Sequence, residues 1–116
     1  MHILLMEDDK NFGLILKNEL EAEDHRVDLA TDGVEGVLNF IRDRHDLVLL
    51  DIRMPRLAGT DALRIIKGLN PMVPAIAFSA NAGNREMEET LAAGACRCLP
   101  KPFLLAELKE EIASYC

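Results

Sequence analysis

Residues 3–9 read ILLMEDD, four consecutive apolar residues followed directly by three acids. Short unbroken apolar runs are typical of strands that are buried on both faces, as in a parallel sheet. A second stretch repeats the pattern, because LVLL at residues 47–50 is followed by Asp51. The two stretches together predict a parallel sheet whose central strands end in acids.

Three further runs complete an alternation of strands and helices. We expect strands at residues 26–29, 75–78 and 97–99, the first of them half-exposed and therefore at an edge. The segments between the strands carry apolar residues at helical spacing, namely Phe12, Leu16 and Leu20; Val34, Val37, Leu38 and Ile41; Leu63, Ile66 and Leu69; Met87 and Leu91; and Leu105, Leu108, Ile112 and Tyr115. Right-handed crossovers between parallel strands then give a (βα)5 α/β fold with a doubly wound five-stranded sheet.

Length and composition limit the class of protein. We expect residues 1–116 to form one domain, because 116 residues suit a single core and 49% of them are hydrophobic. The net charge of −7 opposes direct binding to nucleic acid. No apolar run approaches the roughly 20 residues of a membrane span, and no segment resembles a signal peptide. Three cysteines cannot all pair within one chain, which favours the reducing cytoplasm.

Acids at the ends of the first and third strands predict a metal site. Ligands of doubly wound sheets bind beyond the carboxyl ends of the strands, where the strand order reverses. If these strands are neighbours, Glu7, Asp8 and Asp51 converge, and three close carboxylates repel one another unless a cation or a shared proton compensates. Oxygen ligands with open positions favour Mg²⁺. The alternative is that each acid caps the following helix, the role that we expect for Asp9.

A hydroxyl and a cation follow the fourth and fifth strands at the same edge. Taken singly, Ser79 is typical of a turn and Lys101 of a solvated charge. Beside the acids, they indicate a phosphoryl site. Lys101 and a metal would neutralise the phosphoryl oxygens, Ser79 would donate a hydrogen bond, and Asp51 would attack in line to form an acyl phosphate.

Other chemistries lack their motifs. No P-loop, G-x-G-x-x-G, H-E-x-x-H or C-x-x-C is present, so nucleotide and zinc sites of those kinds lose support. His2, His25 and His45 precede the first, second and third strands, which places them at the opposite edge of the sheet from Ser79. This placement argues against a serine hydrolase, because no histidine is expected close enough to Ser79 to act as its triad base.

In order and spacing, these residues resemble the receiver domain of bacterial two-component response regulators. The resemblance covers essentially the whole chain and rests on residues 3–9, 51–55 with Gly59, 78–80, 94–95 and 101–103. It implies a flavodoxin-like sheet of order 2-1-3-4-5, with Asp51 as the phospho-acceptor, Ser79 as the switch hydroxyl and Lys101 as the phosphate-pairing lysine. It assigns Mg²⁺ to Glu7, Asp8, Asp51 and the main-chain carbonyl of Arg53. It also implies a cis peptide between Lys101 and Pro102.

The resemblance implies a function as well. Receiver domains take a phosphoryl group from a sensor histidine kinase or a small donor and hydrolyse it slowly, so they catalyse only their own phosphorylation and dephosphorylation. The phosphoryl group shifts a two-state equilibrium in the face formed by the fourth helix, fifth strand and fifth helix. That face would contact an output domain or a downstream protein. Homodimers through it are common in the family, and from the short apolar runs we expect no membrane contact.

One departure keeps other functions open. Family members usually carry an aromatic residue three positions before the lysine, where this chain has Cys98. We hypothesise that the output face responds to phosphorylation differently from that of other family members. Alternatively, Phe103 or a partner side chain takes up the space of the missing aromatic ring. A second reading is therefore a receiver-like module that binds partners independently of phosphorylation. A Mg²⁺-dependent phosphatase ranks last, because Arg53 stands where an aspartyl phosphatase needs a general acid.

Several smaller expectations follow from the same residues. Arg53 and Asn81 flank the acceptor and the switch serine and are expected to set the lifetime of the phosphoryl group, unless they are ordinary loop side chains. Pro100 is expected to shorten the fifth strand. Cys96 and Cys98 are interpreted as ordinary core or surface cysteines. The acids of the last two helices, Glu86, Glu88, Glu89, Glu107, Glu110 and Glu111, are interpreted as a solvated face without chemistry.

Overall fold

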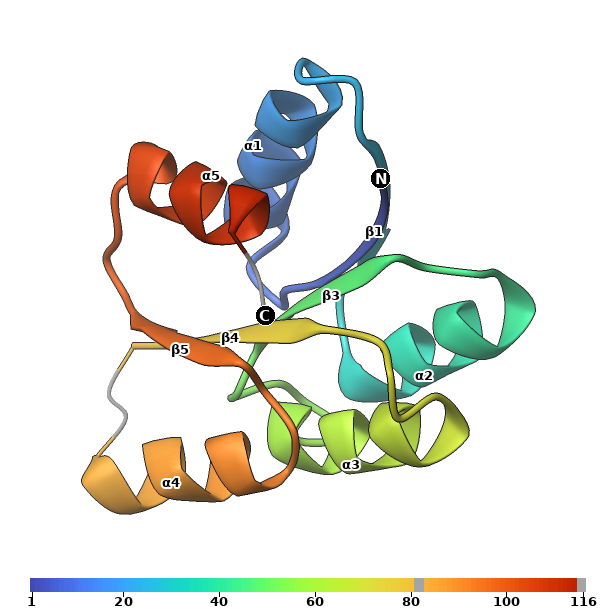
Figure 1. Ribbon diagram of the computed structural model, residues 1–116, viewed down its shortest axis with the longest axis vertical. Coiled ribbons are helices and arrows are strands. Elements are labelled where there is room, and N and C mark those ends of the chain that lie inside the picture. The colour runs from blue at the N-terminus through green and yellow to red at the C-terminus, as the bar shows by residue number, and fades with distance from the viewer. Residues whose placement is uncertain (81–82, 115–116) are drawn as a thin grey trace.

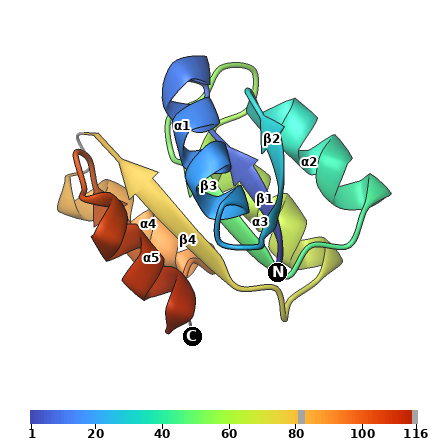
Figure 2. The ribbon, with the colours of Figure 1, turned by 90° about the horizontal axis from the view of Figure 1, so that it is seen from above.

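The computed structural model describes residues 1–80 and 83–114 and contains one parallel sheet. Its strands are β1 (His2–Met6), β2 (Arg26–Ala30), β3 (Leu47–Asp51), β4 (Ala75–Ser79) and β5 (Arg97–Pro100). The strand order is β2-β1-β3-β4-β5, and Figure 2 shows β4, β3, β1 and β2 side by side in that sequence. The predicted α/β fold, the order 2-1-3-4-5 and the edge position of β2 are confirmed.

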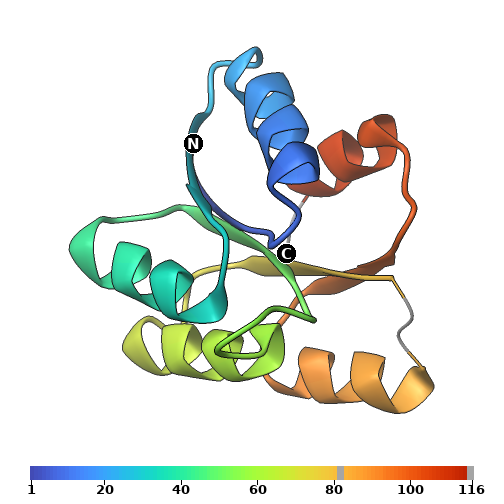
Figure 3. The same cartoon turned by 180° about the vertical axis from the view of Figure 1, so that it is seen from behind.

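Within residues 1–80 and 83–114, five helices cover the two faces of the sheet. They are α1 (Lys10–Glu21), α2 (Gly33–Arg42), α3 (Gly59–Leu69), α4 (Asn84–Ala92) and α5 (Leu105–Ala113). Helices α1 and α5 lie on one face, and α2, α3 and α4 lie on the other (Figures 1 and 3). Asp9 caps α1 as expected, because its Oδ1 accepts a hydrogen bond from the Phe12 amide at 3.1 Å.

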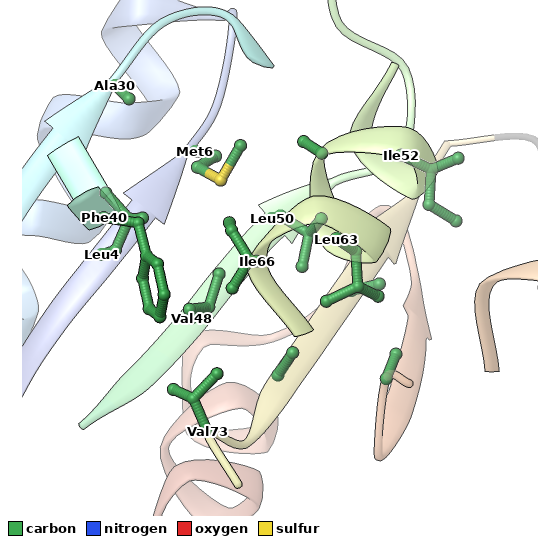
Figure 4. Packing of buried hydrophobic residues seen from close by; sticks show 14 residues of the cluster. Leu4, Met6, Ala30, Phe40, Val48, Leu50, Ile52, Leu63, Ile66 and Val73 are labelled. Atoms are coloured by element: carbon green, nitrogen blue, oxygen red, sulfur yellow. The ribbon is translucent and has the colours of Figure 1, made fainter. Parts of the chain in front are cut away.

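Alternate residues of the central strands fill two cores. One core, between the sheet and helices α1 and α5, contains Ile3, Leu5, Leu47, Leu49, Ile76, Phe78, Leu16, Leu20, Leu108 and Ile112. The other, between the sheet and α2 and α3, contains Leu4, Met6, Val48, Leu50, Leu63 and Ile66 among others (Figure 4). Every residue of β3 and β4 is buried. Burial on both faces is the reason why these strands read as unbroken apolar runs.

The predicted apolar faces of the helices are only partly correct. Leu16, Leu20, Leu63, Ile66, Leu108 and Ile112 are buried as expected, but Leu38, Ile41, Leu69 and Leu91 are exposed, and Tyr115 lies outside the described residues. In α2 the buried positions are Gly33, Gly36 and Phe40. A Cβ at Gly36 would lie 2.3 Å from Met6 Cε, so the helix packs against the sheet through its glycine side. This close approach turns Leu38 and Ile41 towards solvent.

Strand β5 has four residues, one fewer than each of the other strands, in line with the expectation for Pro100 at its end. Cys96, which precedes this strand, and Cys98 within it differ in state. Cys98 is a free thiol, so it does not pair with Cys96. Cys96 is disulfide-bonded, and the interpretation of ordinary unpaired cysteines is therefore wrong for this residue. Among the described residues, no helix is long and apolar enough to span a membrane.

Gly59 allows α3 to begin directly against the end of β3. Its amide donates to the carbonyl of Ile52 at 2.8 Å. A Cβ at this position would lie 2.0 Å from the carbonyl oxygen of Asp51. The glycine therefore fixes the backbone beside Asp51, because any larger residue displaces either the helix or the strand end.

This contact predicts opposite effects for two substitutions in α3. We expect Gly59→Ala to lower the free energy of unfolding by roughly 1–3 kcal/mol, through a clash with the backbone. The matched variant Gly68→Ala lies in the same helix, where an added Cβ meets nothing within 4 Å. We expect it to raise the free energy of unfolding by roughly 0.5–1 kcal/mol. Urea unfolding followed by circular dichroism measures both, and equal stabilities would contradict the packing argument.

Candidate functional site

Three carboxylates meet at the carboxyl edge of the central strands. Glu7 follows β1, Asp8 is its neighbour, and Asp51 ends β3, which pairs directly with β1. One carboxylate oxygen from each lies within 4.8 Å of the others. Glu7 is fully buried, Asp51 is 7% exposed and Asp8 is exposed. The structure thus brings together the acids that the sequence pattern placed at this edge.

Backbone groups orient the two buried carboxylates. The amide of Asp9 donates to Glu7 Oε2 at 3.2 Å, and the amide of Arg53 donates to Asp51 Oδ1 at 3.1 Å. The strand ends are themselves fixed by backbone hydrogen bonds from Glu7 to Ala30 and from Ile52 to Phe78. The carboxylates are therefore held by the sheet and by the first residues of the two loops.

Lys101 supplies the positive charge of the site. Its Nζ donates to Asp51 Oδ2 at 3.0 Å and also donates to Glu7 Oε1. The backbone amide of Lys101 donates to the carbonyl of Ser79 at 2.7 Å, which ties the residue to β4. The peptide bond to Pro102 is cis, as the resemblance implied. The Phe12 ring covers the ammonium, with its centroid 5.0 Å from Nζ. The sequence alone did not predict this contact.

The pKa values reflect this crowding. Burial raises the pKa of Glu7 from 4.5 to about 7; the hydrogen bond from Lys101 opposes this shift and the nearby charge of Asp51 adds to it. Burial acts to lower the pKa of Lys101, but hydrogen bonds to Glu7 and Asp51 outweigh it and raise that pKa. The lysine therefore stays charged, and the acids repel each other strongly enough to favour a proton or a cation between them.

Ser79 lies beside this group with an unpaired hydroxyl. The residue is 1% exposed, and its Oγ has no hydrogen-bond partner among the described residues. A buried polar atom without a partner is unusual and costs stability. A hydroxyl in this position is available to donate to an acceptor that enters the site.

Arg53 forms an ion pair that the sequence reasoning missed. Its guanidinium contacts Glu86 in the first turn of α4, with Nη2 3.0 Å from Oε2. The interpretation of Glu86 as a solvated acid is therefore wrong. Both residues line a cleft of about 720 Å³ that also includes Asp8 and Met54. Asn81, which was expected to act with Arg53, lies outside the described residues.

Phe103 does not replace the aromatic residue that is absent at position 98. Its ring packs with Phe78 at 5.1 Å and with Phe12 at 5.8 Å between centroids, in the core beside α1 and α5. Cys98 packs against the other core, on the opposite face of the sheet. Burial, aided by the charge of Glu86, raises the pKa of the Cys98 thiol, so the thiol stays protonated.

The donor set fits a hard divalent cation. All three side chains offer oxygen, and the Lys101 ammonium contacts two of the three carboxylates, those of Glu7 and Asp51. Mg²⁺ prefers such oxygen ligands and retains positions for water or phosphate oxygens. The arrangement can therefore hold Mg²⁺ beside a buried carboxylate, a lysine and the hydroxyl of Ser79.

Comparison with known proteins agrees with this geometry. Residues 3–113 match the family described as response regulator receiver domain. The response regulator MprA of Mycobacterium leprae is 38% identical over 112 residues, which are 97% of this chain and 49% of that protein. The chain thus spans about half the length of the curated relatives that it matches.

Two solved structures have the same fold. A CheY-like receiver domain protein from Methanospirillum hungatei superposes with a TM-score of 0.94 at 29% identity, over 97% of this chain and 90% of that one. The receiver domain of the sensor histidine kinase PA1611 from Pseudomonas aeruginosa superposes with a TM-score of 0.85 at 38% identity, over 94% and 91%. That structure has a magnesium ion coordinated in its active-site cleft.

Repulsion among the acids predicts that Asp8 destabilises the metal-free protein. We expect Asp8→Asn to raise the free energy of unfolding by roughly 0.5–1 kcal/mol in EDTA, because one of three close charges is removed. In millimolar Mg²⁺ the wild type should instead have the higher free energy of unfolding, since it gains more stability than Asp8→Asn from binding the ion. Thermal unfolding in both buffers measures this. The control Glu88→Gln removes an exposed acid of α4. An equal rise in its free energy of unfolding would show that any loss of negative charge stabilises the protein, and would contradict a specific repulsion at Asp8.

Proposed function

The chain belongs to the family of response regulator receiver domains, and from this premise we propose that it is a phospho-accepting switch of a two-component system. In this proposal Asp51 takes a phosphoryl group from a sensor histidine kinase in a Mg²⁺-dependent reaction. The observation that carries it is the position of Lys101, whose ammonium contacts both Asp51 and Glu7 beside the unpaired hydroxyl of Ser79.

The acceptor step needs no other protein nucleophile. A carboxylate oxygen of Asp51 attacks the phosphorus of phosphohistidine or of a small acyl phosphate, a P–O bond forms, and the bond to the leaving group breaks. Lys101 is already hydrogen-bonded to Asp51, so its charge lies next to the oxygens that the phosphoryl group brings. Ser79 donates its hydroxyl to one of them. Attack by water later releases inorganic phosphate and restores the carboxylate.

Glu7, Asp8, Asp51 and the main-chain carbonyl of Arg53 are the proposed Mg²⁺ ligands. When bound, the ion supplies further neutralisation of the phosphoryl oxygens. The convergence of three carboxylates within 4.8 Å supports this assignment. The buried pair Glu7 and Asp51 then serves two roles, as ligands and as partners of Lys101.

The proposed output face consists of α4, β5 and α5. Movement of Ser79 towards a phosphoryl group would shift the end of β4, the strand that precedes α4, and the Arg53–Glu86 ion pair joins the acceptor loop to the same helix. On this face Leu91 and Leu104 are exposed, and Arg97 pairs with Glu111 at 3.1 Å. These features suit contact with an output domain, a downstream protein or a second copy of the chain.

Cys98 favours one alternative, a receiver-like module that binds partners independently of phosphorylation. Its small side chain cannot act as the aromatic residue that couples site and output face elsewhere in the family. In either case we propose a cytoplasmic protein without direct contact to nucleic acid, since the net charge is −7, and without catalysis on other substrates.

Intact mass spectrometry tests the acceptor. Incubation with acetyl phosphate and Mg²⁺ should add one phosphoryl group, about 80 Da, to the wild type and none to Asp51→Asn. Ser79→Ala is the matched control, because it removes a hydroxyl of the site and leaves the acceptor in place. Absence of an adduct in the wild type would favour the phosphate-independent module, and an adduct on Asp51→Asn would refute Asp51 as the acceptor.

The cleft predicts a role for Arg53 in the lifetime of the phosphoryl group. Because its side chain lines the cleft with Glu86 and lies next to the acceptor loop, Arg53→Ala should admit water and speed hydrolysis several-fold, a barrier change below about 1.4 kcal/mol. Mg²⁺ affinity should stay nearly unchanged, since the proposed ligand is a backbone carbonyl.

Decay of the adduct, followed after removal of acetyl phosphate, measures the rate. Glu86→Gln is the companion variant, because it loosens Arg53 without removing it and should give a smaller change of the same sign. An unaltered decay in Arg53→Ala would show that the side chain has no part in hydrolysis.

A further inference from the structure

A second group of potential metal ligands lies towards the amino ends of the strands, away from the carboxyl ends where Glu7 and Asp51 lie. It comprises His2 at the start of β1, Asp28 in β2 and His45, which precedes β3. One ligand atom from each lies within 4.8 Å of the others. Residues two apart on a strand share a face, so His2 and Leu4 point to the same side, towards α2 and α3. The cluster is thus separate from the acids that follow β1 and β3.

The three side chains are closely held. Asp28 Oδ2 accepts from Nε2 of His2 at 2.7 Å and from Nε2 of His45 at 2.9 Å. The two imidazole rings lie 4.3 Å apart, and Phe40 stacks on His45 at 5.9 Å between centroids. The side chain of His45 is 0% exposed, whereas those of His2 and Asp28 are 13% and 27% exposed. The group is fixed on its inner side and reachable from its outer side.

We propose that His2, Asp28 and His45 bind a borderline divalent cation such as Zn²⁺. Two imidazole nitrogens and one carboxylate oxygen are a donor set found in zinc sites that keep a fourth, open position. Mg²⁺ is disfavoured here, because it prefers oxygen ligands. Neighbouring ligand atoms of tetrahedral zinc lie about 3.3 Å apart. To bind the ion, the Nε2 atoms of His2 and His45 must therefore each move roughly half an ångström away from Asp28 Oδ2.

Proton positions set the expected strength of binding. Both Nε2 atoms donate to Asp28 in the metal-free form, so each must release its proton and each ring must carry a proton on Nδ1 instead. Nδ1 of His45 is buried and has no hydrogen-bond partner among the described residues, which weakens binding. Burial acts to raise the pKa of Asp28, but hydrogen bonds from His45 and His2 lower it, so the carboxylate is ionised. We therefore expect a Kd in the micromolar rather than the nanomolar range.

Isothermal titration with ZnCl₂ tests the site on the whole chain. A background of 10 mM MgCl₂ is chosen to occupy the acidic edge near Asp51. The wild type should bind one Zn²⁺ per chain with a Kd of about 1–10 µM, and His2→Gln and Asp28→Asn should each weaken this by about tenfold or more. His45 is left unchanged, because loss of its buried ring would disturb the packing on Phe40. Co²⁺ absorption gives a second readout, since tetrahedral coordination produces intense visible bands.

Two control variants separate this site from others. His25→Gln removes the third histidine, whose Nδ1 lies 3.1 Å from the amino group of Met1, and should bind Zn²⁺ like the wild type. Asp51→Asn should also bind normally. Loss of binding in either control would assign the ion to the amino terminus or to the acidic edge and would overturn the proposal. So would equal binding in all variants, or no binding by the wild type below about 1 mM.

Discussion

The contact of the Lys101 ammonium with the carboxylates of Glu7 and Asp51 is the interaction on which the site depends. The apolar strands β1 and β3 are neighbours because their side chains fill both cores, and this pairing forces their terminal acids together. Two buried carboxylates at such a distance are unfavourable without compensation. A lysine delivered by the segment after β5 makes the arrangement tolerable and leaves it ready to receive a cation.

The sequence pattern predicted the strands and placed acids at the ends of the first and third strands, and the family resemblance supplied the strand order that makes these strands neighbours. Unbroken apolar runs that end in acids are a local signal, and parallel topology places all such ends at one edge. Helix α2 was less predictable, since the close approach of Gly36 to Met6 depends on how the helix rotates over the sheet. Glu86 was missed for a related reason, because its partner Arg53 is 33 residues away and only the folded chain brings them together. The aromatic contacts of Phe12 could have been suspected from its place in the first turn of α1.

The Arg53–Glu86 ion pair gives the acceptor loop a direct connection to α4. Exposed ion pairs contribute little to stability, and 61% of the Arg53 side chain is exposed. If Asp51 is phosphorylated as proposed, this pair would be a link that can break or reform when the loop after β3 changes charge. Cys98 lies near the same helix and packs on the core opposite Phe103. Under the proposed function, coupling between Asp51 and the output face would therefore run through α4 rather than through an aromatic side chain of β5.

The late position of Lys101 in the chain has a consequence for synthesis on the ribosome. Glu7, Asp8 and Asp51 all leave the exit tunnel well before residue 101, and β1 can pair with β2 and β3 as soon as they emerge. During that interval the growing chain carries the acidic edge without its lysine. The repulsion among these acids is therefore relieved by the lysine only when the segment after the last strand joins the sheet.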